Sequence, residues 1–327
     1  MKTRVWGLDD GFGEIKVAGL HPAMGSGVAP QQGGATCKGV GTMQGVQVAI
    51  PSLIRPGARL ELGSNGRENA IYHTEGQSFT MGGGVDTLNT RFDGYERSPM
   101  NRVMSFHALL SQGFAAGDTV VTGLPVRLYF RADGSVNQEA IEARKASLQV
   151  DVLDAAQEVL PKPGKIKVVA QGLAALMTLD CESAAILDVG ARTMDATVFQ
   201  GGRILMDRTG GRNMGVLDMQ ARFAERIAKH FAYPLADHLV YRAFRDGRVK
   251  VMGKEHDLSA DREAAIQEVA GSIWQEAASI FRTVQDVDRV ILVGGGAAFL
   301  GAPWPHVQVA SDPVFANAQG MLAYGSQ

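Results

Sequence analysis

The chain carries one short pattern twice: an apolar strand, an aspartate, a glycine-containing turn and a second strand. The first copy is Leu8-Asp9-Asp10-Gly11 and runs on through residues 12–16. The second is Leu187-Asp188-Val189-Gly190 and runs on through residue 195. Each copy predicts a β-hairpin with an aspartate and a glycine at the end of its first strand. The duplication predicts two related α/β halves.

Hairpin turns of this composition suit phosphate binding. Their consecutive N–H groups can face phosphate oxygens, and a carboxylate beside the turn can hold the hydration shell of Mg2+. The alternative is that Asp-Gly forms an ordinary hairpin turn, which is the better interpretation of a single copy. Two copies, together with a third glycine-rich turn, favour a clamp for a polyphosphate.

The third turn is Gly294-Gly295-Gly296, which follows the apolar run of residues 290–293. Bare backbone there would let an adenine and a ribose lie against the chain. A dinucleotide-binding fingerprint is the competing interpretation, but Phe299 replaces its third glycine and too few residues follow. No G-x-x-x-x-G-K-[ST] motif occurs, which excludes a P-loop NTPase.

Composition narrows the function further. The 327 residues are 45 % hydrophobic, enough for a large core, and the formal charge of -2 leaves no basic excess for direct nucleic-acid binding. Cys37 and Cys181 lie outside any CxxC pattern, which argues against a disulfide framework and a zinc site. No apolar run reaches the roughly 18 residues of a membrane span, and the first residues lack a signal-peptide pattern. We expect a cytoplasmic protein without membrane contact.

Hydrophobic periodicity and turn residues predict the remaining elements. Ser98 and Ser259 are expected to cap helices, and Asn137 to open a long, broken helix that ends before Pro161. The other expected helices cover residues 99–113, 172–179, 214–231, 259–283 and 313–324, and the other strands cover residues 119–124, 166–170, 184–189, 195–199 and 289–293.

The three motifs resemble the actin superfamily. Residues 8–16 look like its first phosphate loop, residues 187–195 like its second and residues 293–296 like its adenosine loop. Their order along a chain of this length is similar to the bacterial and archaeal actin-like proteins of the ParM/StbA type. The resemblance implies an α/β, actin-like fold, that is, a ribonuclease H-like duplicated two-domain ATPase fold with a nucleotide cleft between the domains.

The resemblance also implies domain bounds. Domain I comprises residues 1–175 and 310–327, with a small β-rich subdomain inserted at about 22–94. Domain II comprises residues 176–309, with a small subdomain inserted at about 216–262.

By the same resemblance, ATP or ADP and Mg2+ are the expected cofactors. Asp9 and Asp188 would hold the Mg2+ water shell, and Gln171 would orient the attacking water. Gly211 lies in a segment, 210–213, that either caps the next helix or brings its backbone to the ribose. The other residues expected against the nucleotide are Asp10, Gly11, Phe12, Gly13, Lys16, Gly190, Ala191, Arg192, Thr193, Gly294, Gly295 and Gly296.

Three residues depart from the family pattern. Gln171 stands where many plasmid-type relatives carry Glu, and Phe12 stands where a Ser or Thr hydroxyl is common. Arg192 replaces a small residue and either adds a cation near the phosphates or points to solvent. Elsewhere, Glu225 and Lys229 are expected to form an i,i+4 pair on a solvated helix face.

The function that the resemblance implies is a filament-forming ATPase whose slow hydrolysis is stimulated by polymerisation, with residues 171–175 as a hinge. Such a protein would segregate plasmid DNA or position another cargo through a DNA-bound adaptor. The alternatives are a small-molecule kinase with Asp195 as general base, and a scaffold ATPase that does not polymerise.

Overall fold

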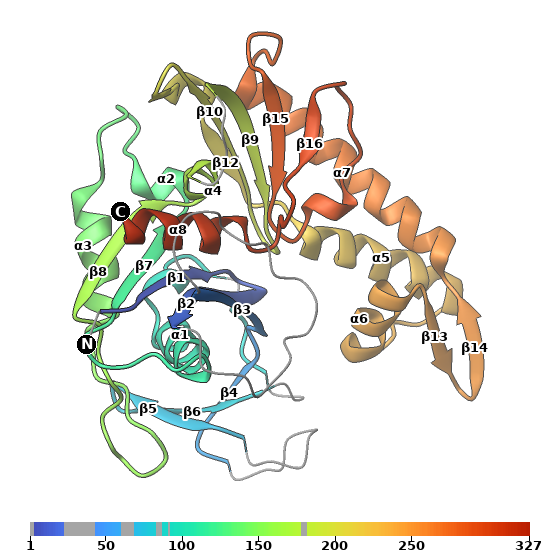
Figure 1. Ribbon diagram of the computed structural model, residues 1–327. Helices are drawn as coiled ribbons and strands as arrows, with labels where there is room; N and C mark the ends of the chain where they lie inside the picture. The colour runs from blue at the N-terminus through green and yellow to red at the C-terminus, as the bar shows by residue number, and fades with distance from the viewer. Residues whose placement is uncertain (1–2, 23–42, 60–68, 83–86, 91, 178–181) are drawn as a thin grey trace. The chain divides into compact units, whose positions relative to one another are not determined.

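The computed structural model describes residues 3–22, 43–59, 69–82, 87–90, 92–177 and 182–327 (Figure 1). The chain divides into two compact units. Unit 1 comprises Met1–Asp180 and Val314–Gln327, and unit 2 comprises Cys181–Pro313. The sequence placed these divisions near residues 175 and 310. Cys37 and Cys181 lie outside the described residues.

Unit 1 is built on a five-stranded sheet with the order β3-β2-β1-β7-β8. The pairs β1–β2 and β2–β3 are antiparallel, whereas β1–β7 and β7–β8 are parallel. The hairpin and both later strands predicted for this half are confirmed. The strands are β1 (Val5–Asp10), β2 (Glu14–Pro22), β3 (Met43–Pro51), β7 (Thr119–Leu124) and β8 (Lys165–Ala170).

Helices pack on both faces of this sheet. Trp6 and Leu8 belong to a core cluster with α1 (Pro99–Ser111). Gly7 points the opposite way, because side chains alternate along a strand, and a Cβ there would meet the Ala318 carbonyl of α8 (Ala316–Ser326) at 2.0 Å. Small residues therefore let α8 lie directly on β1.

The predicted inserted subdomain at residues 22–94 begins too early. Strand β3 belongs to the main sheet, since it pairs along β2 and packs Val48 and Ile50 against the core of unit 1. A separate three-stranded sheet, β4-β6-β5, follows it. Its strands are β4 (Ile54–Pro56), β5 (Ile71–Thr74) and β6 (Gln77–Met81).

Several helix predictions for unit 1 need correction. Ser98 does cap α1, accepting a hydrogen bond from Asn101 N at 3.2 Å. Asn137 opens α3 (Gln138–Ser147), but this helix does not continue toward Pro161 as predicted. It ends at Ser147, whose carbonyl accepts a hydrogen bond from Arg102 Nε at 2.6 Å. The other short helices are η1 (Tyr95–Arg97), α2 (Val126–Tyr129) and α4 (Leu173–Leu176).

Unit 2 repeats the topology of unit 1. Its sheet has the order β11-β10-β9-β15-β16, and β9 is antiparallel to β10 but parallel to β15. The same sequence of antiparallel and parallel neighbours surrounds β1. This correspondence confirms the predicted duplication. The strands are β9 (Ser183–Val189), β10 (Met194–Gln200), β11 (Arg203–Ile204), β12 (Gly210–Arg212), β15 (Arg289–Val293) and β16 (Val307–Val309).

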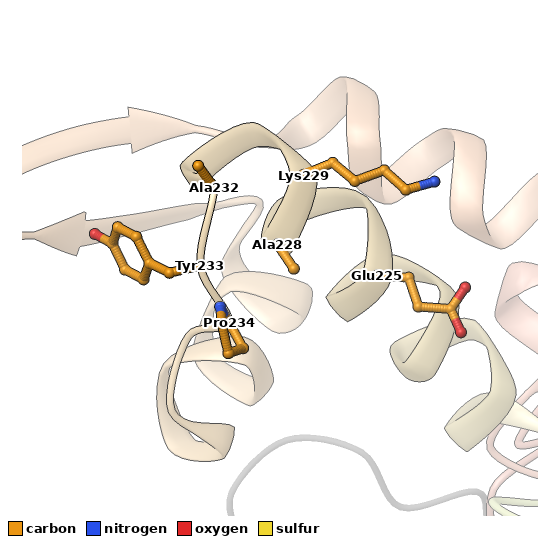
Figure 2. A pocket seen from close by; sticks show the side chains of 6 residues that line it. All are labelled: Glu225, Ala228, Lys229, Ala232, Tyr233 and Pro234. Atoms are coloured by element: carbon orange, nitrogen blue, oxygen red, sulfur yellow. The ribbon is translucent and has the colours of Figure 1, made fainter.

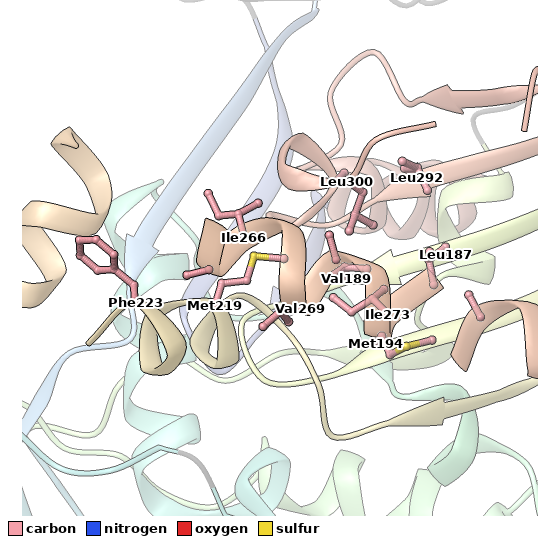
Figure 3. Packing of buried hydrophobic residues seen from close by; sticks show 14 of the residues in the cluster. Leu187, Val189, Met194, Met219, Phe223, Ile266, Val269, Ile273, Leu292 and Leu300 are labelled. Atoms are coloured by element: carbon pink, nitrogen blue, oxygen red, sulfur yellow. The ribbon is translucent and has the colours of Figure 1, made fainter. Parts of the chain in front are cut away.

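Two amphipathic helices cover the core of unit 2. α5 (Val216–Phe231) buries Met219, Phe223 and Ile227, and α7 (Ser259–Phe281) buries Ile266 and Ile273, all in one cluster with the sheet (Figure 3). Ser259 is the first helical residue rather than the cap, because its hydroxyl faces the Gly247 carbonyl.

The sequence missed a further helix of unit 2. It predicted a small inserted subdomain at about 216–262 but no helix between residues 231 and 259, where the chain forms a helix and a hairpin. These elements are α6 (Asp237–Asp246), β13 (Arg248–Val251) and β14 (Lys254–Asp257). Short 3-10 helices also occur in unit 2 at Met206–Arg208 and Ala297–Phe299.

Candidate functional site

The β1–β2 turn has its carbonyl groups bound by the surrounding protein. Gly11 O accepts from Ser52 Oγ at 3.0 Å, Phe12 O from Thr90 Oγ1 at 2.9 Å and Gly13 O from Ser52 N at 2.9 Å. The Gly13 amide donates no hydrogen bond within the described residues. A turn whose carbonyls are held in this way presents its N–H side to an anion.

The β9–β10 turn of unit 2 is held in the same manner. Gly190 O and Ala191 O accept from Val216 N at 3.2 Å and Leu217 N at 2.9 Å, at the first turn of α5. Gly190 N closes the turn onto Thr193 O at 2.8 Å. Across the part of the chain that the structure describes, the amides of Ala191 and Thr193 donate no hydrogen bond. Both halves therefore carry a turn suited to phosphate.

Gly215 makes this second turn possible, and the sequence reasoning did not identify it. A Cβ at Gly215 would lie 2.6 Å from both the Gly190 and the Ala191 carbonyl oxygens. Its own N–H donates to Asp218 Oδ2 at 2.7 Å, at the start of α5. The available signal was a glycine followed three residues later by an aspartate, directly before an amphipathic helix.

Three of the predicted site residues meet at the end of β1. Asp9 pairs across the hairpin with Lys16, and its Oδ2 lies 3.7 Å from Lys16 Nζ. Gln171 Nε2 donates to Asp9 Oδ1 at 3.3 Å. Asp9 and Lys16 are largely buried. The carboxylate, the cation and the amide expected to serve metal, phosphate and water are thus neighbours within unit 1.

Gln171 follows β8 and is positioned from two sides. Its backbone N–H donates to Leu124 O at 2.8 Å. Its side chain crosses Gly123, where a Cβ would lie 2.5 Å from Gln171 Cγ and 2.5 Å from Met321 Cε. A side chain larger than hydrogen at residue 123 would displace Gln171. No local sequence pattern indicates this contact, because Gly123 lies in β7 and Gln171 follows β8.

Asp10 does not share the surroundings of Asp9. Its side chain is buried and forms an ion pair with Arg144 at 2.9 Å. The sequence grouped Asp10 with the residues that contact the nucleotide, but its carboxylate points into unit 1 instead. Alternation along β1 explains the difference, since adjacent side chains of a strand face opposite sides.

Phe12 replaces the expected hydroxyl with an anchored ring. It stacks on Tyr95, with the ring centroids 5.0 Å apart and the planes at 29°. Tyr95 is buried, and this burial raises the pKa of its phenol, which therefore stays neutral. The ring of Phe12 fastens the turn to the core of unit 1 rather than reaching a ligand through a polar atom.

In unit 2, the third glycine-rich turn packs against the end of β9. Gly294 has φ of +85°, and a Cβ there would lie 2.5 Å from Asp188 Oδ1. Gly296 N donates to Val189 O at 2.8 Å, whereas Gly295 is exposed with open space beside it. Asp188, the second turn and this third turn therefore form one local cluster.

The remaining predicted residues of unit 2 are also placed. Gly211 lies in β12, where a Cβ would meet Asp195 Oδ1 at 2.4 Å. Residues 210–213 therefore do not cap α5, because β12 pairs with β10 and Gly215 stands before the helix. Arg192 is half-buried in the turn, so it does not simply point into solvent. Asp195 is buried.

A surface pocket of unit 2 lies away from these turns. It has a volume of about 510 Å3 and surrounds the C-terminal end of α5, lined by Glu225, Ala228, Lys229, Ala232, Tyr233 and Pro234 (Figure 2). The β9–β10 turn contacts the opposite end of that helix, roughly 20 Å away at 1.5 Å per residue. Glu225 pairs with Arg222 at 2.9 Å rather than with Lys229 as the sequence predicted.

The described residues form neither a cluster for direct metal ligation nor a membrane-spanning helix. Over the described ranges, no three His, Cys, Asp or Glu side chains are grouped to coordinate a metal ion directly. Nor does any helix in those ranges combine the length and the apolar composition needed to cross a bilayer.

Comparison with known proteins decides the fold family. Residues 186–303 match the family model described as archaeal actin homologue MreB-like, C-terminal. The archaeal actin homologue Ta0583 superposes with a TM-score of 0.76 at 21 % identity, covering 99 % of both chains. The chain has the actin-like fold.

Further structures agree with this actin-like assignment. Ta0583 in complex with ADP gives a TM-score of 0.73 at 21 % identity over 99 % of both chains. ParM from Clostridium botulinum, in a 15-stranded filament, gives 0.74 at 17 % identity over 100 % of both. Comparison with curated protein sequences gives no match. The predicted resemblance to the actin superfamily is thus confirmed for the fold of this actin-like chain.

Proposed function

We propose that the chain is an ATPase that binds one Mg-ATP with its two duplicated turns and assembles into filaments. The observation that carries this proposal is that both turns hold their carbonyls against the protein and stand beside an aspartate. Two unrelated structural turns would not need the same arrangement. The ADP found in Ta0583 and the filament of the Clostridium botulinum ParM support the same function.

In this proposal the amides of residues 11–13 and 191–193 hold the phosphates, whereas the amide of Gly190, also expected there, closes its own turn onto Thr193 O. Lys16 neutralises part of the phosphate charge. Gln171 orients the attacking water, which its amide can do as donor and acceptor. Residues 294–296, and Gly211 of β12, would face the adenosine. The chain's contribution to hydrolysis is then positioning and electrostatic stabilisation.

The donor set fits Mg2+ held through water. Asp9 lies 3.7 Å from Lys16, which is longer than a close ion pair, and Asp188 is half-buried beside the second turn. Mg2+ keeps several waters and takes one or two carboxylates together with substrate phosphates. Bound Mg2+ would neutralise charge on the phosphates, and Asp9 and Asp188 would hold its water ligands.

Self-association is the second part of the proposal. The carboxylate beside the Gln171 amide is that of Asp9, which this proposal assigns to the Mg2+ water shell, and an amide does not take up a proton, so hydrolysis by the single chain should be slow. Contacts between subunits in a filament would complete the alignment, with residues 171–175 as the hinge. We further propose that such a filament segregates DNA or positions another cargo through an adaptor protein in the cytoplasm.

The test combines pelleting with phosphate release. The protein should sediment with Mg-ATP or a non-hydrolysable analogue, and less with ADP. Asp188→Ala should abolish Mg-dependent nucleotide binding, whereas Gln171→Ala should leave binding intact and slow phosphate release about 100-fold. Equal loss of binding in both variants would contradict the assigned roles. A soluble protein that phosphorylates an added metabolite would instead indicate a small-molecule kinase, and ATP hydrolysis without sedimentation a scaffold ATPase.

A further inference from the structure

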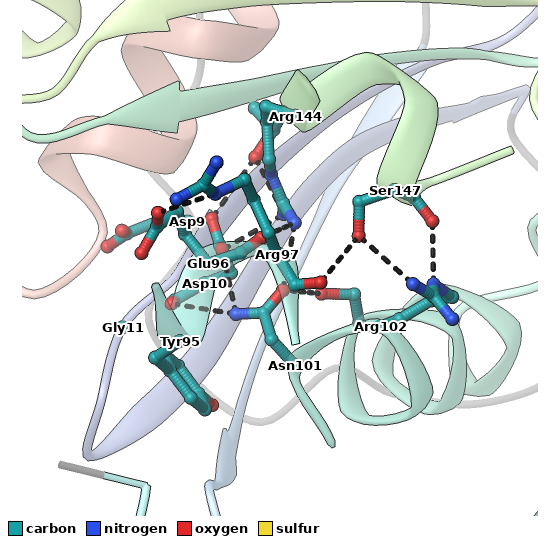
Figure 4. A network of polar contacts seen from close by, with 12 residues as sticks. Asp9, Asp10, Gly11, Tyr95, Glu96, Arg97, Asn101, Arg102, Arg144 and Ser147 are labelled. Atoms are coloured by element: carbon teal, nitrogen blue, oxygen red, sulfur yellow. Dashed lines mark hydrogen bonds and ion pairs between the residues drawn. The ribbon is translucent and has the colours of Figure 1, made fainter. Parts of the chain in front are cut away.

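An ion pair is buried directly behind the β1–β2 turn (Figure 4). Arg144 Nη2 of α3 lies 2.9 Å from Asp10 Oδ2, and the two side chains are 0 % and 2 % exposed. Removing two charges from water costs free energy, and well-packed apolar residues often give equal or greater stability. A buried pair of this kind therefore need not add stability, and its partners show what geometry it fixes.

The hydrogen bonds around the pair occupy both carboxylate oxygens of Asp10. Asn101 Nδ2 donates to Oδ2 at 2.8 Å, and Thr122 Oγ1 donates to Oδ1 at 3.1 Å. Asp10 thus has partners on β7, α1 and α3. An acceptor held from three elements has one orientation.

Arg144 is held as firmly as its partner. Its Nη1 donates to Asn101 Oδ1 at 2.9 Å and also to the carbonyl of Glu96 in η1, and its Nη2 reaches Thr122 Oγ1 at 3.3 Å. Asn101 and Thr122 therefore contact both members of the pair, which closes the network. One turn after Arg144 in α3, Ser147 belongs to a second network, in which Arg102 of α1 donates to the Ser147 carbonyl.

The position of Asp10 in the chain connects this network to the β1–β2 turn. Asp10 immediately precedes Gly11, so its backbone sets the direction in which the turn leaves β1. Asp9, one residue earlier, faces Lys16 and Gln171. The two consecutive aspartates thus have different roles: Asp9 faces the side proposed to bind the ligand, and Asp10 anchors the end of β1.

We propose that Asp10 and Arg144 are positioning residues that hold the amides of residues 11–13 in the arrangement that accepts the phosphates of a nucleoside triphosphate. This inference rests on the proposed function. It assigns to α3, far from the turn in sequence, a part in nucleotide affinity. Thr122 and Asn101 support the pair by fixing both partners at once.

The experiment compares Asp10→Asn, Thr122→Val and the double variant Asp10→Asn/Arg144→Met with a matched control. The control is Asp118→Asn, since Asp118 is another buried aspartate of unit 1 that pairs with an arginine, Arg4, at 3.0 Å. Asp118 directly precedes β7, where it also accepts from Trp6 Nε1 at 2.9 Å. Because Val5 pairs with Thr119, Asp118 lies beside the start of β1, at the end of this strand opposite to the turn.

Two readouts separate positioning from stability. Mg-ATP affinity should fall about 10- to 100-fold in Asp10→Asn, as when a group that orients a ligand is removed, and less in Thr122→Val. In nucleotide-free protein, the Ser52 amide, which donates to Gly13 O, should exchange its hydrogen faster in both variants. The control should lower stability but leave both readouts within about twofold of the wild type.

The double variant distinguishes loss of positioning from loss of stability. It contains no unpaired buried charge, whereas Asp10→Asn leaves Arg144 without its carboxylate, so the double variant should be more stable than Asp10→Asn while its affinity stays as low. Wild-type affinity in the double variant, or unchanged Ser52 exchange in Asp10→Asn, would overturn the inference and leave the proposed function standing. If the wild type binds no nucleotide, the proposed function fails, and the Ser52 exchange still tests the positioning role.

Discussion

At the scale of single residues, the candidate site depends on glycines that leave room for a neighbouring group as much as on the polar side chains themselves. The sequence identified Asp9, Lys16 and Gln171, and the structure brings them together at the end of β1. It did not identify Gly123 or Arg144, because their partners lie on other elements and no local pattern marks them. Chemistry-bearing residues follow from motifs, whereas the groups that aim them depend on the tertiary contacts.

Gly123→Ala is expected to act through Gln171. A Cβ 2.5 Å from Gln171 Cγ forces that side chain away from Asp9. With the role proposed for Gln171, in orienting the attacking water, this displacement costs about 100-fold in rate. Phosphate release should therefore slow to nearly the level of Gln171→Ala, while nucleotide affinity changes little. Single-turnover assays with each variant and the Gly123→Ala/Gln171→Ala double variant measure this. Additive losses in the double variant would show that Gly123 acts independently of Gln171.

At the scale of elements, apolar runs and helical periodicity predicted β1, β2, β7 and β8 of unit 1, β9, β10 and β15 of unit 2, and the long helices α1, α5 and α7, but not the short strands β11, β12 and β16. The errors fall where short local patterns compete with distant contacts. Strand β3 joined the main sheet because β2 offered a long edge, and α3 ended where Arg102 takes the carbonyl of Ser147. Helix α6 was missed because only Ala243 and Phe244 are buried along it.

The junction between the β9–β10 turn and α5 should be sensitive to one methyl group. Gly215→Ala places a Cβ 2.6 Å from two carbonyl oxygens, so we expect a loss of about 1–3 kcal/mol in the free energy of unfolding, together with weaker nucleotide binding. Gly271→Ala in α7 is the matched control. Nothing lies within 4 Å of a Cβ there, and the change should stabilise by about 0.5–1 kcal/mol. Urea denaturation distinguishes them, and equal effects would refute the close-contact explanation.

At the scale of the whole molecule, the two units have separate cores and differ in whether one continuous stretch of chain forms them. Unit 2 is continuous in sequence, whereas unit 1 needs residues 314–327, which form α8. Met321 of α8 completes a small cluster with Val121 and Ala174. A Cβ at Gly325 would lie 2.4 Å from Val5 Cγ1, so the end of α8 is adjacent to the start of β1.

This organisation predicts how fragments behave. Residues 181–313 alone should fold and melt cooperatively, whereas residues 1–180 should not, because α8 is missing from the sheet. Joining residues 314–327 through a short linker to the start of residues 1–180 should restore folding. Circular dichroism melts of the three fragments test this, and cooperative melting of residues 1–180 without α8 would contradict it.

Because unit 1 is formed by two separate stretches of chain, it can complete its folding only after unit 2 has been synthesised. Residues 181–313 leave the ribosome before residues 314–327, so the second half of the protein can finish folding while the first still waits for its last helix. The Asp9 turn then acquires its final support only when translation has passed both glycine-rich segments of unit 2. If both turns hold one ligand, as proposed, a nascent chain cannot bind it until residues 314–327 have been made.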